Sequence, residues 1–174
     1  QSIDQAESKL RGLGHTADEV SAIMANANSA VTGTAFGMGE AASVAAAAVA
    51  ANIAPGKELE RVLSLTGDAA SIAGVSMSEM GSIFNKVATD GRIQGDVINQ
   101  LGDKGIPILQ LLAEEMGVTA EAARKMAPDG KVSFETFLNA IEDGMGGAAL
   151  EAGATFKGAM DNAWAAVGRV GAAF

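Results

Sequence analysis

The stretch that most constrains the fold is the most apolar run of the chain, Ile-Pro-Ile-Leu-Gln-Leu-Leu at residues 106–112. In a helix, its apolar side chains would fall on every side, which is typical of a helix enclosed by others. The proline fits a first helical turn, where its missing amide has no partner to lose. We therefore expect residues 88–117 to contain a buried helix around which the rest of the chain packs.

The remaining composition favours helices that pack closely. The sequence is 48% hydrophobic, with 22 glycines and only 4% aromatic residues. Alanine, leucine, methionine and glutamate favour helix, whereas the β-branched and aromatic alternation of strands is sparse. Because alanine buries little area, helix backbones should lie near one another in the core. Glycine and proline interrupt the helical patterns repeatedly, so the chain must fold back on itself.

These patterns predict an all-α, compact multi-helix domain of about eight to ten short helices with Asp-Gly turns. Residues 1–34 are interpreted as loosely held N-terminal helices and residues 35–174 as the main helical domain, in a fragment of a longer protein. Glu19 and Glu79 are each expected to complete a capping box. Four hydroxyl side chains are predicted to cap helix N-termini: Thr16, Ser76, Thr119 and Ser133.

Two central helices have distinct patterns. Residues 40–53 are rich in alanine and too short to span a bilayer, so this helix should pack against others through small side chains. Residues 57–73 form an amphipathic helix. Its solvent face is predicted to carry Lys57, Arg61 and Asp68.

A weak repeat joins the two Asp-Gly turns, because Asp90-Gly91 recurs 39 residues later as Asp129-Gly130. Each turn lies between two helices, a pattern that is similar to an EF-hand. The positions that would ligate calcium carry lysine, alanine, valine or threonine instead, which excludes that site. We expect a minimal β-bridge between Ile93 and Val132 to hold the turns together.

The last helix, from about residue 148 onward, has the clearest amphipathic pattern and should be longer than the others. We expect its apolar face to be partly exposed as an interaction face, and the helix to continue past residue 174 in the manner of a coiled coil. The candidate interaction face comprises Phe156, Met160, Trp164, Val167, Val170 and Phe174.

Charge and residue types exclude several functions. The net charge of −9 opposes nucleic-acid binding through a basic patch. The chain has no cysteine and one histidine, His15, which lacks the partners of a metal or catalytic site. We therefore assign no catalytic, cofactor-binding or metal-binding residues, and no cofactor.

The ordered blocks of the second half resemble the tape measure proteins of long-tailed bacteriophages and prophages. One block holds Asn-Gln-Leu and Gly-Ile-Pro within residues 99–112, after a match over 84–93. Gly-Lys-Val-Ser at 130–133 and a glycine-rich block at 144–148 follow. Thr-Phe-Lys-Gly opens the last block at 155–164, with Gly-Arg at 168–169. The resemblance covers most of residues 35–174.

This resemblance implies a structural domain near the start of a rod that sets tail length. Its implied partners are tail tube and tail-tip proteins and assembly chaperones, with self-association left open. The implied location is the tube lumen of the virion tail, and the bacterial host cytoplasm before assembly. Because a ruler needs continuous helix, the broken pattern here favours an anchor, organiser or plug over the measuring rod itself.

Two other functions stay open as alternatives. The first is a peptidoglycan-degrading domain using the carboxylates Glu114-Glu115 or Glu142-Asp143. Neighbouring residues on a helix point about 100° apart, which argues against either pair. The second is a membrane-active helical domain acting at DNA ejection. The weakly apolar segment 40–54 and the acidic charge argue against stable insertion by this piece.

Overall fold

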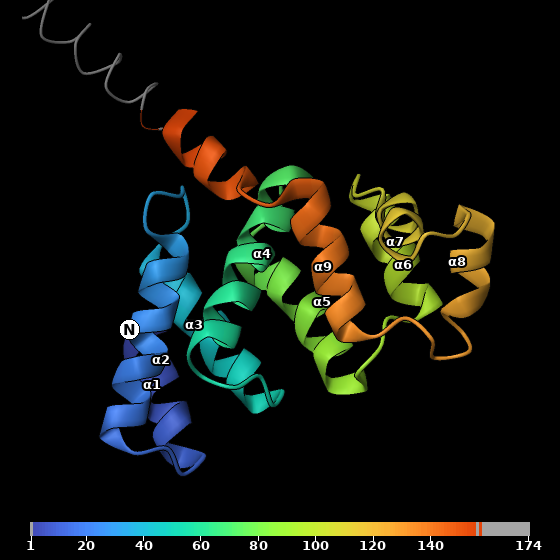
Figure 1. The fold of residues 1–174 in the computed structure, drawn as a ribbon. Coiled ribbons are helices and arrows are strands. Elements are labelled where there is room, and N and C mark those ends of the chain that lie inside the picture. The colour runs from blue at the N-terminus through green and yellow to red at the C-terminus, as the bar shows by residue number, and fades with distance from the viewer. Residues whose placement is uncertain (1, 156, 158–174) are drawn as a thin grey trace, which may run out of the picture.

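The computed structural model describes residues 2–155 and residue 157, and this part of the chain folds into nine numbered α-helices without a sheet (Figure 1). A further helical stretch begins at residue 148 and is described to residue 155. The predicted all-α fold is confirmed. The helices are α1 (Ser2–Gly12), α2 (Ala17–Val31), α3 (Met38–Ala50), α4 (Lys57–Ala73), α5 (Met77–Asp90), α6 (Gly95–Asp103), α7 (Ile108–Met116), α8 (Ala120–Met126) and α9 (Phe134–Met145).

The predicted caps begin four of these helices. The hydroxyl of each cap accepts a hydrogen bond from the amide three residues later, which satisfies one free donor of the first turn. Thr16 and Glu19 form the complete capping box that the sequence predicts. At α5 only the Ser76 half of the predicted box forms, and the Glu79 carboxylate lies 3.5 Å from Lys104 Nζ instead. The capping hydroxyls are those of Thr16, Ser76, Thr119 and Ser133.

The helix at the centre of the fold is α3, the alanine-rich one. It packs against α1, α2, α4 and α5, and most of its residues are buried. The backbones come close, as the small side chains predict: a Cβ atom added at Gly81 of α5 would lie 2.7 Å from Cγ1 of Val44. The buried residues of α3 are Ala41, Ala42, Val44, Ala45, Ala46, Ala48 and Val49.

The apolar run at residues 106–112 does not form the enclosed helix that the sequence predicts, and this expectation was wrong. Ile108 and Leu112 of α7 are buried, but Leu109 is half-buried and Gln110 is exposed. The physical reason is the position of α7 in the fold, which leaves one side of the helix uncovered. Helix α7 packs against α6, α8 and α9 at one side of the molecule, away from α3 (Figure 1).

The two repeated turns meet in a single antiparallel bridge. The Ile93 amide donates to the Val132 carbonyl at 2.9 Å, and the Phe134 amide donates to the Gly91 carbonyl at 3.1 Å. The pair that faces each other is Arg92 and Ser133, so the bridge exists one residue away from the predicted pairing. The register differs because the hydrogen bonds flank the facing pair. Ile93 and Val132 instead point into the core, where both are fully buried.

Helix α1 packs against α3, and α2 packs against α3 and α4. Leu10 of α1 and Ile23 of α2 are both fully buried, and the Asn26 side chain accepts a hydrogen bond from the Gly56 amide at 2.9 Å. A domain boundary at residue 34, with a loosely held segment before it, stays a prediction.

Arg61 ties α4 to α9. Its guanidinium donates to Glu135 at 2.9 Å, to Asn139 at 2.7 Å and to Glu142 at 2.9 and 3.1 Å. Burial lowers the pKa of Arg61, but the hydrogen bonds to Glu142 and Glu135 outweigh burial and raise it above its usual value. The face of α4 that carries Arg61 therefore meets α9 rather than open solvent.

Candidate functional site

The predicted interaction face lies outside the described residues. Its members are Phe156, Met160, Trp164, Val167, Val170 and Phe174, and the face stays a prediction. The structure does describe the residues that lead into the predicted last helix. After α9, the chain turns at Gly146 and Gly147, where Gly147 has a φ of +88°. Helical conformation then resumes over residues 148–155, which we call the exit helix.

A buried carboxylate from α4 caps the exit helix. Asp68 is only 5% exposed, so its predicted place on the solvent face was wrong. Its Oδ2 accepts a hydrogen bond from the Gly147 amide at 3.0 Å, and its Oδ1 accepts one from the Ala149 amide at 2.9 Å. A carboxylate at this place satisfies free amides of the first turn and is favoured by the helix dipole. Because these amides are satisfied by another helix, the cap joins the exit helix to α4.

Asp68 and Arg61 belong to one polar stripe on α4. They are seven residues apart, which places them on the same side of the helix about two turns from each other. Arg61 bonds to α9, and Asp68 bonds to the residues just after it. This stripe holds the segment at residues 135–149 in place, whereas Lys57 at the start of α4 is exposed.

A second contact lies one turn further along the exit helix. A Cβ atom added at Gly153 would lie 2.0 Å from the Gly33 carbonyl oxygen and 2.7 Å from Cα of Thr34. Only glycine allows this approach, because both atoms belong to the backbone. Leu150 also reaches this loop, where its Cδ2 lies 3.2 Å from the position of a Gly33 Cβ. The exit helix therefore crosses directly over the loop after α2.

A surface groove of about 610 Å³ runs between the end of α4 and the exit helix. Ile72 contributes to its wall and is 50% exposed. Leu150 of the exit helix does not line the groove but is 56% exposed as well. Ala148, Ala152 and Ala154 supply small side chains on the other wall. Ser71, Glu151 and Thr155 also line the groove, so it combines apolar and polar contact area, and Glu151 is the one charged residue among those lining it.

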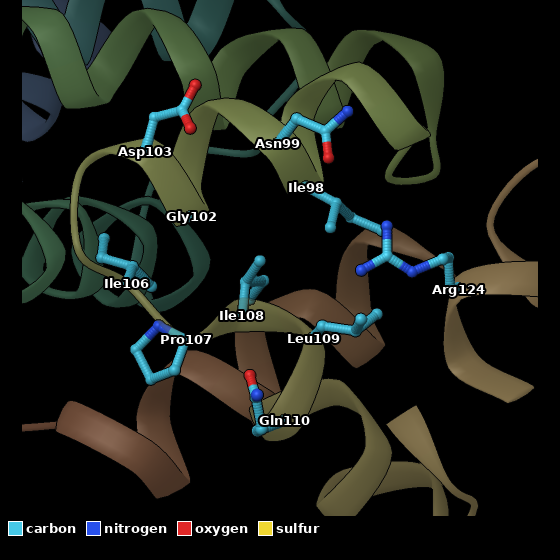
Figure 2. A pocket seen from close by; sticks show the side chains of 10 residues that line it. All are labelled: Ile98, Asn99, Gly102, Asp103, Ile106, Pro107, Ile108, Leu109, Gln110 and Arg124. Atoms are coloured by element: carbon cyan, nitrogen blue, oxygen red, sulfur yellow. The ribbon is translucent and has the colours of Figure 1, made fainter. Parts of the chain in front are cut away.

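A second groove, of about 240 Å³, lies between α6, α7 and α8 (Figure 2). The Arg124 side chain of α8 points toward Ile98 and Leu109, and Asp103 lies at the far end on α6 (Figure 2). Five residues of the apolar run also line the groove: Ile106, Pro107, Ile108, Leu109 and Gln110. The groove therefore combines apolar contact area with separated charges of both signs. Such a lining is typical of protein contact surfaces.

A comparison with known families decides what kind of protein this is. The family profile described as "Tape measure protein" matches residues 1–174. The chain belongs to the tape measure protein family. The resemblance in its second half is thereby confirmed, and the tape measure chain has a structural role in a phage tail. No curated protein and no solved structure matches it.

Tape measure proteins are a structural family and not a known enzyme family. In this tape measure chain, Glu142 is held by Arg61 at 2.9 Å. Asp143 instead meets Glu115 across the α7–α9 contact. A hydrogen bond to Asp143 raises the pKa of Glu115, and partial desolvation and the like charge of Asp143 add to that rise. The sequence did not predict this pair, because its members come from different helices.

The described part of the tape measure chain contains neither a metal site nor a membrane span. Among residues 2–155 and 157, no group of three or more His, Cys, Asp or Glu side chains could hold a metal ion. Within the same residues, no helix is both long and apolar enough to cross a membrane. His15 lies beside the Thr16 cap, with Nδ1 3.7 Å from the Glu19 carboxylate.

Proposed function

We propose that this domain organises the base of a tape measure protein, and contributes to tail length determination and tail assembly through packing and protein binding. The observation that supports the proposal is the folding of the chain back on itself. The longest helix of the described residues, α4, has 17 residues. At about 1.5 Å per residue it spans roughly 25 Å, whereas residues 2–155 as one helix would span about 230 Å.

The partners we propose are tail tube and tail-tip proteins and the tail assembly chaperones. The groove of Figure 2 and the groove beside the exit helix both combine apolar and polar side chains, which suits them to protein contacts. The proposed location is the lumen of the tail tube after assembly and the host cytoplasm before. A membrane-active or wall-degrading role has no comparable support in the geometry.

Tail length in the parent phage or prophage tests the proposal. Residues 2–147 are deleted in frame, and tails are counted and measured by electron microscopy. If these residues act as a ruler, tails shorten by about 220 Å, in proportion to the number of residues lost. An organiser gives far fewer tails, and those that form are not shortened by that amount.

A matched variant separates the folded domain from its residue count. Val44→Asp places an unpaired charge in the buried face of α3 and unfolds the domain without changing the chain length. An organiser loses tail assembly in this variant, while Ser43→Asp on the exposed side of the same helix retains it. Normal tail numbers and normal tail length for Val44→Asp would contradict the proposal.

A further inference from the structure

We infer that Asp68 and Gly153 form a seat that fixes the direction in which the exit helix leaves the domain. The inference starts from the break between α9 and the exit helix. Gly147 has a φ of +88° and a Cβ added there would meet no atom within 4 Å. Glycine in such a position can adopt many conformations, so the backbone at the break does not set the direction by itself. Contacts elsewhere must set it.

The first contact is the cap from Asp68. Its two carboxylate oxygens accept two different amides, those of Gly147 and Ala149. Ala149 is itself buried, and its Cβ lies 3.7 Å from the position of a Cβ at Gly67 of α4. Two hydrogen bonds from one rigid group restrict both the position and the rotation of the first turn. Hydrogen bonds to a charged acceptor are also stronger than neutral ones.

The second contact is the backbone crossing at Gly153. Positions 149 and 153 are four residues apart, so both lie on the same side of the exit helix. One of them is fixed to α4, and the other rests on the loop at Gly33 and Thr34. Two fixed points, one turn apart on the same side, define the axis of a helix. Figure 1 shows that the exit helix is set off from α9 by the break and runs in a different direction.

The seat deepens the proposed function, on which its meaning for the tail rests, because a domain that anchors a rod must orient it. The geometric part stands independently of that role. It assigns Asp68 and Gly153 as positioning residues, and it predicts that each can be changed without altering the packing of α3, α4 and α5.

The direction is measured by electron spin resonance on the full 174-residue chain. Because the chain has no cysteine, Glu58→Cys and Thr155→Cys give two unique label sites, both exposed. The parent chain should give one narrow distance distribution. Asp68→Asn loses one of two acceptors, and Gly153→Ala forces the exit helix off the loop, so each should broaden or shift the distribution. The matched controls Asp129→Asn and Gly102→Ala, whose positions lie away from the seat, should leave it narrow.

Hydrogen exchange supplies a second readout, and its first part needs only the parent chain. In the parent chain, the Gly147 and Ala149 amides should be protected, and in Asp68→Asn the exchange at these amides should accelerate by roughly tenfold or more. Rapid exchange of both amides in the parent chain would overturn the inference even if a variant failed to fold. So would unchanged distances in both variants.

Tail assembly distinguishes this inference from the proposed function. If the two variants change the distances but the phage still makes normal tails, the seat stands and its proposed role in orienting a rod fails. If the distances stay narrow while assembly is lost, the seat is overturned and the organising role of the domain stands.

Discussion

The close contact between α3 and α5 allows a quantitative test of the claim that the alanine-rich helix is the centre of the fold. The perturbation is Gly81→Ala. Its new methyl would lie 2.7 Å from Cγ1 and 3.2 Å from Cγ2 of Val44, well inside contact distance. Val44 is β-branched and stiff at χ1, so it cannot rotate freely out of the way. Overpacking of this kind costs about 1–3 kcal/mol.

Helix propensity acts in the opposite direction. Replacing glycine by alanine inside a helix stabilises it by about 1 kcal/mol, so the net loss for Gly81→Ala is roughly 0–2 kcal/mol. The single variant alone is therefore a weak test. Combining it with Val44→Ala is stronger, because that change removes the two methyl groups that the new side chain would meet. The double variant should be more stable than the sum of the single changes by about 1–3 kcal/mol.

The assay is urea unfolding followed by circular dichroism, with free energies compared in a double-mutant cycle. Gly102→Ala in α6 is the control, because its Cβ would meet no atom within 4 Å. It should stabilise the chain by up to about 1 kcal/mol and show no coupling to Val44→Ala. Additive effects at positions 44 and 81, to within about 0.5 kcal/mol, would refute the close packing of α3 against α5.

Three further changes test other parts of the structure. Leu10→Ala leaves a cavity at a fully buried position on α1 and should lower the free energy of unfolding in urea by about 2–5 kcal/mol. A loss below about 1 kcal/mol would instead support a loosely held N-terminal segment. Arg61→Met removes the link from α4 to α9 and should lower the free energy of unfolding by about 1–2 kcal/mol. A high salt concentration should reduce this loss. An unchanged free energy of unfolding would show that the link is only a surface ion pair. Asp143→Asn should lower the pKa of Glu115, measured by carboxyl NMR. Because the pKa of Glu115 is raised in the folded state, Glu115 stabilises the fold below its unfolded-state pKa, and this contribution is lost as pH rises through its folded-state pKa. Asp143→Asn should therefore flatten that part of the profile of unfolding free energy against pH. An unchanged Glu115 titration in the variant would contradict the pairing.

Features that depend on neighbours in sequence could be predicted. The caps at Thr16, Ser76, Thr119 and Ser133 each use an amide three residues away, and all four form. Helix α4 begins and ends at the predicted residues, with Gly74 in the left-handed conformation just after it. Such signals are local, so a single sequence contains them in full.

Features that depend on distant partners could not be predicted. The spacing of charged residues along α4 predicted Asp68 on the solvent face. Its burial could not be predicted from nearby residues, because the two amides that it binds lie 79 and 81 residues later. The apolar run at 106–112 indicated burial correctly for Ile106, Ile108 and Leu112, but its continuity does not say how many helices surround it. Conversely, α3 is central because its alanines allow close approach, and a hydrophobicity pattern gives alanine little weight.

The candidate site shows the same division. The glycine-rich break before the last helix was visible in sequence. The amphipathic pattern that follows lies mostly outside the described residues and stays a prediction. The use of Gly153 as a crossing point was not visible, because nothing near it in sequence indicates the loop at Gly33. One signal was available: an aspartate within a helix whose neighbours Gly67 and Ala69 are small and apolar is an unusual candidate for a solvated position.

The cap on the exit helix also has a mechanical consequence. A pulling force applied to that helix is transmitted to the domain near its start, through the hydrogen bonds from Asp68 and the turn at Gly146 and Gly147. Asp68 belongs to α4, which also packs against α2, α3, α5 and α9. We therefore expect tension on the exit helix to pass into α4 through this cap as well as into α9 along the chain.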